Sequence, residues 1–185
     1  ARATCAAYGW WCHPDAAIPY KLYPAFLTRD TQVLLVAVFA ACAAEVVPLA
    51  IAAGFTEFVG HLRAYAQAAG KELDFRPLLD VVARAEEKLA ACLAGMPART
   101  PEARNRFIRR FEQILVPLLY GKGPLTGHDP ALRQPPVPLL EEIPAMLEET
   151  DAHRKNAFAT LLRRRCNECV MRVREIEDLL DSPLQ

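Results

Sequence analysis

The stretch from Asp151 to Leu180 reads DAHRKNAFATLLRRRCNECVMRVREIEDLL, and it decides the fold. Along it, apolar side chains recur in alternating steps of four and three residues. This spacing places them on one face of a long helix, as in an antiparallel bundle or a coiled coil. We therefore predict a helix whose buried face consists of Leu162, Cys166, Cys169, Val173, Ile176 and Leu180.

Four segments upstream also carry helix signals. Asp30 can accept hydrogen bonds from the amides of a first turn, and Pro48 should kink or end the helix that follows. Gly70 suits the left-handed end of a second helix, and Thr100 before Pro101 is a typical helix start. We predict an all-α bundle of four or five helices, with the upstream helices at residues 30–48, 56–70, 74–95 and 101–119.

Two segments lack helix signals because prolines interrupt them. The first 26 residues contain an aromatic cluster and several prolines, and residues 120–138 alternate proline with glycine and polar residues. We predict an irregular segment over residues 1–26, a helical domain over residues 27–185, and a long proline-rich connection within that domain.

The composition excludes several classes of protein. The chain has 185 residues, 52% of them hydrophobic, and its 22 basic side chains are balanced by 22 acidic ones. A chain with balanced charges lacks the basic surface that nucleic acids require. The high apolar fraction is not typical of disordered proteins. The six cysteines are scattered rather than dense, so we expect most of them to be reduced. The composition does not indicate a compartment.

Residues 33–53 form an apolar run that is long enough to cross a bilayer. Much of the run is alanine, however, and Glu45 lies within it, where an acid costs about 2.5–3.5 kcal/mol on insertion. We therefore expect a helix that its neighbours bury on most sides. A membrane anchor stays the alternative, which a chain soluble without detergent would exclude.

Several motifs could carry chemistry but have simpler explanations. Cys166 and Cys169 have the C-x-x-C spacing of zinc and redox sites, yet both fall on the apolar face of the long helix, which favours core packing. Residues 163–165 are three arginines with glutamates nearby, which favours a solvated helix face. His128 and Asp129 could pair as a base or a ligand, but Asp129 before Pro130 also favours a turn.

His13 follows an aromatic cluster, Tyr8-Gly9-Trp10-Trp11, and precedes Lys21, Pro24 and residues 29–32, which read RDTQ. This arrangement resembles the end of the catalytic domain in bacterial aminopeptidases of the co-catalytic zinc type, relatives of glutamate carboxypeptidase and the transferrin receptor. The likeness extends over most of the chain through Pro48-Leu49, Asn105-Arg106, residues 117–120 (PLLY) and residues 127–132 (GHDPAL).

The resemblance implies a zinc ligand at His13 and a dimerisation role for the helical region. The chain departs from the family pattern where Pro14 follows the histidine and where Cys12 stands in place of an aromatic residue. The other metal ligands of the family have no counterpart in this chain, and a two-metal hydrolase needs several of them. We thus expect no catalysis from this chain alone.

From the resemblance, we predict that the chain is a non-catalytic helical dimerisation or scaffold domain. Its partner would be a second copy or a peptidase catalytic domain. The alternative is part of an active zinc metallopeptidase in which His13 is the last ligand and the others lie outside this chain. Zinc is expected as a cofactor only in that second case.

Overall fold

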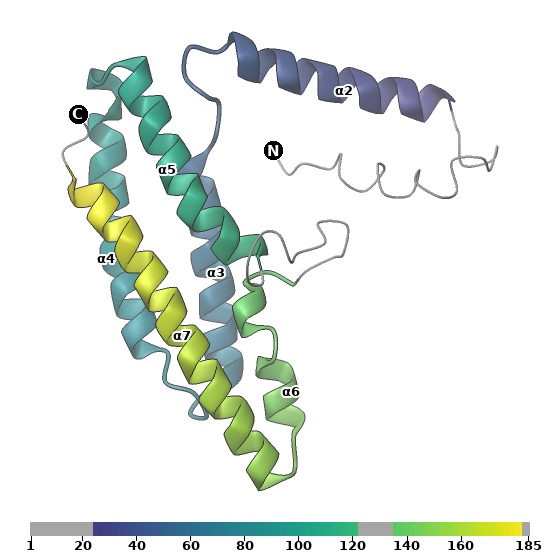
Figure 1. Cartoon of the computed structure of the whole chain (residues 1–185), viewed down its shortest axis with the longest axis vertical. Helices are drawn as coiled ribbons and strands as arrows, with labels where there is room; N and C mark the ends of the chain where they lie inside the picture. Colours follow the sequence, from purple (N-terminus) through teal and green to yellow (C-terminus); the bar gives the residue numbers. More distant parts are fainter. Residues whose placement is uncertain (1–23, 122–134, 183–185) are drawn as a thin grey trace. The chain divides into compact units, whose positions relative to one another are not determined.

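The computed structural model describes residues 24–121 and 135–182, and within them the fold is all-α, as predicted (Figure 1). The described residues form six α-helices and two short 3₁₀ helices, with no strand among them. The elements are α2 (Pro24–Ala43), α3 (Ile51–Ala69), α4 (Arg76–Gly95), η2 (Met96–Ala98), α5 (Pro101–Tyr120), η4 (Pro138–Leu140), α6 (Ile143–Glu148) and α7 (Ala152–Asp181).

These elements belong to two compact units. Helix α2 belongs to the first, whose described residues are 24–48. The other helices belong to the second unit, whose described residues are 49–121 and 135–182. The boundary predicted from the sequence after residue 26 stays a prediction.

The second unit is a helical bundle around α7. Helix α7 packs mainly against α4 and also contacts α5 and α6, while α3 contacts α4 and α5 (Figure 1). Four buried phenylalanines fill the centre between α3 and α5, with ring centroids 5.8–6.0 Å apart in the contacting pairs: Phe55, Phe58, Phe107 and Phe111. Tilted and edge-on rings at this spacing stabilise a core beyond simple burial.

The predicted face of α7 is buried with one change at its end. The side chains from Leu162 to Ile176 on this face are buried, but Leu179 takes the place expected for Leu180. Beside it lies Glu177, which is only 7% exposed and accepts a hydrogen bond of 3.1 Å from the Arg84 guanidinium of α4. Lys88 lies 3.7 Å from the same carboxylate, so two cations compensate its burial.

Three predicted helix ends are confirmed by their capping bonds. Gly70 ends α3 with φ of 54°, a backbone conformation that residues with a Cβ rarely adopt. The Thr100 hydroxyl accepts a hydrogen bond of 3.3 Å from the Ala103 amide at the start of α5. The Asp151 carboxylate accepts one of 2.8 Å from the Arg154 amide at the start of α7.

Other boundaries predicted from the sequence are wrong. Helix α2 begins at Pro24 instead of Asp30 and ends at Ala43 before reaching Pro48, and α3 begins at Ile51 instead of Thr56. Residues 135–150, which we call the return segment, contain η4 and α6, and neither was predicted. Helix α2, η4 and α6 each have a proline in the first turn, where its missing N–H is not needed.

Replacing Phe111 with alanine tests the aromatic centre of the bundle. The ring is fully buried, so Phe111→Ala should lower the free energy of unfolding by about 3–5 kcal/mol, measured by urea denaturation. The matched control is Val116→Ala on the same helix, where a side chain 42% exposed should cost less than about 1 kcal/mol. Equal losses in both variants would contradict this assignment of the core.

Candidate interaction site

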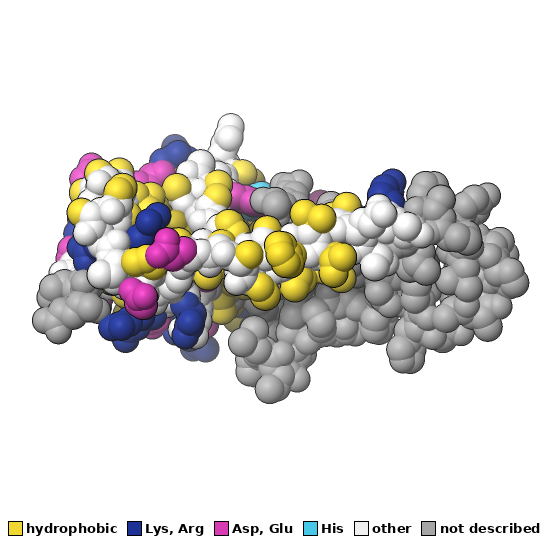
Figure 2. Space-filling model, turned by 90° about the horizontal axis from the view of Figure 1, so that it is seen from above, with side chains coloured by type: hydrophobic (Ala, Val, Ile, Leu, Met, Phe, Trp, Pro, Cys, Tyr) yellow, Lys and Arg dark blue, Asp and Glu magenta, His cyan; other side chains and the backbone are white. Residues whose placement is uncertain are grey.

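Helix α2 carries large hydrophobic side chains on every side. Its exposed apolar residues follow each other along the sequence, so they cannot share a single stripe: Val33, Leu34, Leu35, Val36, Val38 and Phe39. Their exposed fractions range from 50% for Leu34 to 73% for Phe39. Figure 2 shows hydrophobic side chains gathered along this helix. From the sequence, we expected neighbouring helices to bury this segment. In the structure of the single chain, its large apolar side chains are exposed instead.

The polar end of α2 lies just before this apolar stretch. Arg29 and Asp30 form an ion pair of 2.9 Å on adjacent residues, and both groups remain partly exposed. From Thr31 to Ala43 no charged residue follows. The helix therefore has one charged turn and then only polar or apolar side chains. None of the described helices combines the length and the hydropathy needed to cross a membrane.

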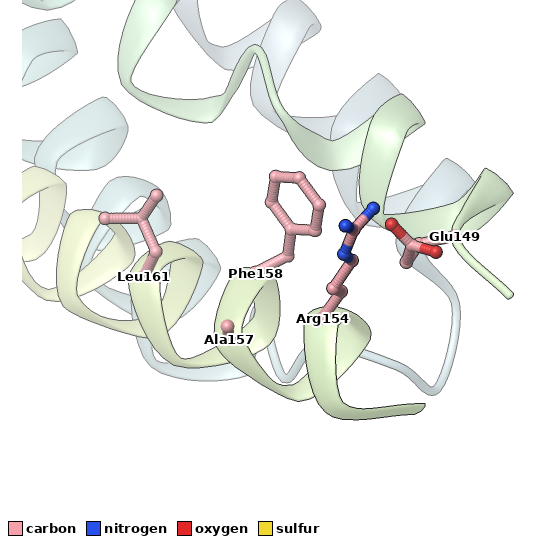
Figure 3. A pocket seen from close by; sticks show the side chains of 5 residues that line it. All are labelled: Glu149, Arg154, Ala157, Phe158 and Leu161. Carbon is pink, nitrogen blue, oxygen red and sulfur yellow. The ribbon is translucent and has the colours of Figure 1, made fainter. Parts of the chain in front are cut away.

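A second apolar feature lies on the bundle, where α7 begins. A pocket of about 460 Å³ is lined by Glu149, Arg154, Ala157, Phe158 and Leu161, and we call it the α7 groove (Figure 3). The ring of Phe158 and the guanidinium of Arg154 point to the same side of the helix, with the carboxylate of Glu149 facing the guanidinium (Figure 3). The groove thus has a charged end and an apolar floor.

Local hydrogen bonds hold the charged end of the groove in place. The Glu149 carboxylate accepts a hydrogen bond of 3.0 Å from the Asp151 amide. Lys155 forms an ion pair of 3.0 Å with Glu72, which ties this turn of α7 to the segment after α3. Among the interactions of the described residues, none involves the Arg154 side chain. Its charge is therefore available to an incoming group.

A second hollow of about 350 Å³ lies between α5, η4 and α7, with lining residues Gln113, Ile114, Pro117, Leu118, Gly121, Leu139, Glu168 and Arg172. Its basic residue, Arg172, is already bound to Glu175 at 3.0 Å. It contains no cysteine or histidine and combines no nucleophile with a base. Because its arginine is already in an ion pair, it is a weaker candidate for binding a charged group than the α7 groove.

The structure places the C-x-x-C pair in the core, which confirms the core-packing interpretation. Cys166 is 6% exposed, Cys169 is fully buried, and both are free thiols. Burial raises the pKa of Cys166 to about 11 and that of Cys169 to about 12. A thiol with so high a pKa is a poor nucleophile at neutral pH, because the thiolate is the reactive form.

The arginine run has two different environments. Arg163 and Arg164 are exposed, as expected for a solvated face, whereas Arg165 is half-buried. Its guanidinium contacts the Glu142 carboxylate and donates a hydrogen bond of 3.2 Å to the Leu139 carbonyl. Arg165 therefore anchors the return segment to α7.

The structure does not describe the residues that were predicted from the sequence as a zinc ligand or a base. His13 and the His128–Asp129 pair lie outside the described residues. Within residues 24–121 and 135–182, no group of three histidine, cysteine or acidic side chains could hold a metal ion. No family model matches the chain, and comparisons with curated proteins and with solved structures find no match. The likeness to zinc aminopeptidases stays a prediction.

Sequence reasoning missed the residues of the α7 groove. Phe158 and Leu161 precede the predicted buried face and lie beside it on the helix. The available signal was a second apolar spacing, since positions 154, 157, 158 and 161 fall on one side of a helix. That spacing identifies one face of the helix. It does not predict that Glu149, which lies before α7, completes the groove.

Thiol labelling tests the assignment of the cysteines. At pH 8, an alkylating reagent should modify the exposed Cys42 in the folded protein and leave Cys166 and Cys169 unmodified, as mapped by mass spectrometry. A thiol with a pKa of about 11 is only about one part in a thousand thiolate at that pH. All three cysteines should react after denaturation. Equal labelling rates in the folded protein would contradict the core assignment.

Proposed function

We propose that this chain is a non-catalytic helical scaffold whose helix α2 mediates self-association into a homodimer. The observation that carries the proposal is the row of six large apolar side chains on α2, each at least half exposed in a single chain. Contiguous apolar surface of this kind is typical of protein interfaces. The resemblance to the dimerisation region of zinc aminopeptidases supports the same role.

The energetics favour a large apolar contact. Burying the exposed half of six such side chains on each of two copies contributes roughly 10 kcal/mol. Association itself costs about 4–15 kcal/mol in lost freedom, so the gain is of the right order for a stable contact. Most of the stability of a helix in a protein comes from packing of its apolar surface, so a partner would also stabilise α2 itself.

The sequence supports a second candidate. The aromatic cluster before His13 fits a zinc-peptidase segment that supplies a last ligand to a site completed by another chain. In that case α2 would pack against a peptidase catalytic domain rather than a second copy. Zinc content and oligomeric state separate the two candidates.

The oligomeric state tests the scaffold proposal directly. At about 50 µM, the chain should elute as a dimer in size-exclusion chromatography with light scattering. A fully dimeric chain at this concentration requires a Kd near 1 µM, which corresponds to about 8 kcal/mol of net association free energy. Phe39→Asp, at the most exposed of the large apolar side chains on α2, should shift the protein to monomer. Met171→Asp, an equally conspicuous exposed residue on α7, is the matched control and should leave the dimer intact. A strictly monomeric wild-type chain would contradict the proposal.

Metal analysis tests the peptidase candidate. If that candidate is correct, the complex of this chain with the peptidase domain that supplies the other ligands should contain stoichiometric zinc by mass spectrometry of the elements, and His13→Ala should lower the zinc content, since the imidazole would be a ligand. His153→Ala, at an exposed position on α7, is the control and should not change the zinc content. A complex whose zinc content does not change in His13→Ala would contradict this candidate.

A further inference from the structure

We propose that the α7 groove receives helix α2 of a second copy of this chain. This inference rests on the proposed function, because it names the surface on which α2 docks. It is carried by the match between the two surfaces in spacing, charge and side-chain size.

The spacing of the two surfaces is the same. The groove presents positions 154, 157, 158 and 161 of α7, where one charged residue is followed by three apolar ones. Helix α2 presents Asp30, Val33, Leu34 and Ala37 at the same intervals. Residues at these intervals share one face of a helix, so both faces have a charged turn followed by two apolar turns.

The charges at the matching ends are complementary. The groove has the Arg154 guanidinium, which the Glu149 carboxylate faces, and α2 has the carboxylate of Asp30, paired with Arg29, at the equivalent position. The second charge of the groove, Glu149, has an opposite counterpart in Arg29. Because each charged turn precedes its apolar turns, pairing them requires the two helices to run parallel. Complementary charges of this kind set the register of an interface.

The apolar parts also fit in size. Ala37 and Ala41 lie on the same side of α2 as Asp30, and small side chains allow a helix to approach closely. The groove offers a ring, Phe158, that such a surface can accommodate. Val33 and Leu34 are 53% and 50% exposed, and Leu161 of the groove is 38% exposed, so both surfaces are uncovered in the single chain.

The opposite side of α2 stays available for the rest of the interface. Phe39 lies about 180° from Asp30 around the helix, since nine residues correspond to two and a half turns. Phe39→Asp therefore tests self-association in general, whereas changes at Asp30 test docking in the groove. The two hypotheses can fail separately.

Reciprocal charge reversal tests the docking. Asp30→Arg and Arg154→Asp each place like charges together at both contacts of the dimer. Each should raise the dimer Kd by about tenfold or more, measured by sedimentation equilibrium, since each of the two contacts loses about 1 kcal/mol. Both positions are at least partly exposed, so the bundle should fold, as circular dichroism can verify. The matched control is Arg163→Asp, an exposed residue about 180° from Arg154 on α7, which should leave the Kd unchanged.

Mixing the two single variants identifies the chain that supplies α2. In a mixed dimer, each α2 meets a groove of opposite charge on the other copy, so the Kd should return to within about threefold of the wild-type value. Recovery in the double variant but not in the mixture would mean that α2 docks on its own chain, and it would overturn the inference. Single variants that dimerise like wild type would also overturn it while leaving the proposed function standing. A monomeric wild-type chain would overturn both.

Discussion

The packing of α7 against its neighbours is the interaction on which the rest of the bundle depends. This helix contacts α4, α5, η4 and α6, so its buried face connects elements that are far apart in the sequence. Small side chains such as Cys166 and Cys169 suit this face, because free cysteine packs as a small hydrophobe. The Glu177 carboxylate, held by Arg84 and Lys88, lies at the same contact with α4 and adds polar specificity to it.

Helix α2 obeys a different constraint. A helix with one apolar stripe satisfies that stripe against a bundle and leaves its polar side to water, as α5 and α7 do. Helix α2 has apolar side chains all round, so no single neighbour can cover it. This difference is the basis on which we propose that α2 associates with a second copy. The α7 groove, with its charged end and apolar floor, is the surface on which we propose that one side of α2 from a second copy docks.

Local signals in the sequence predicted the helices whose ends depend on local chemistry. Thr100, Asp151 and Gly70 act through hydrogen bonds or backbone freedom within a few residues, and each ends or begins a helix as expected. The return segment was missed because its order comes from distant partners. The Tyr65 hydroxyl donates a hydrogen bond of 2.9 Å to the Pro136 carbonyl, and the Val137 amide donates one of 3.0 Å to the Leu119 carbonyl. Pro138, at the end of the connection predicted to be extended, instead stands in the first turn of η4, and Pro144 stands in the first turn of α6.

By itself, the sequence determined the all-α class, the buried face of α7 and the apolar run of α2 from Val33 onward, because periodicity and capping act over one or two turns. Only the tertiary structure decided that residues 135–148 pack as short helices against α7 and that Glu149 joins Arg154 and Phe158 in a groove. The physical reason is that a pocket forms where separate segments meet. Which segments meet depends on contacts between residues far apart in the chain, and local spacing does not encode those contacts.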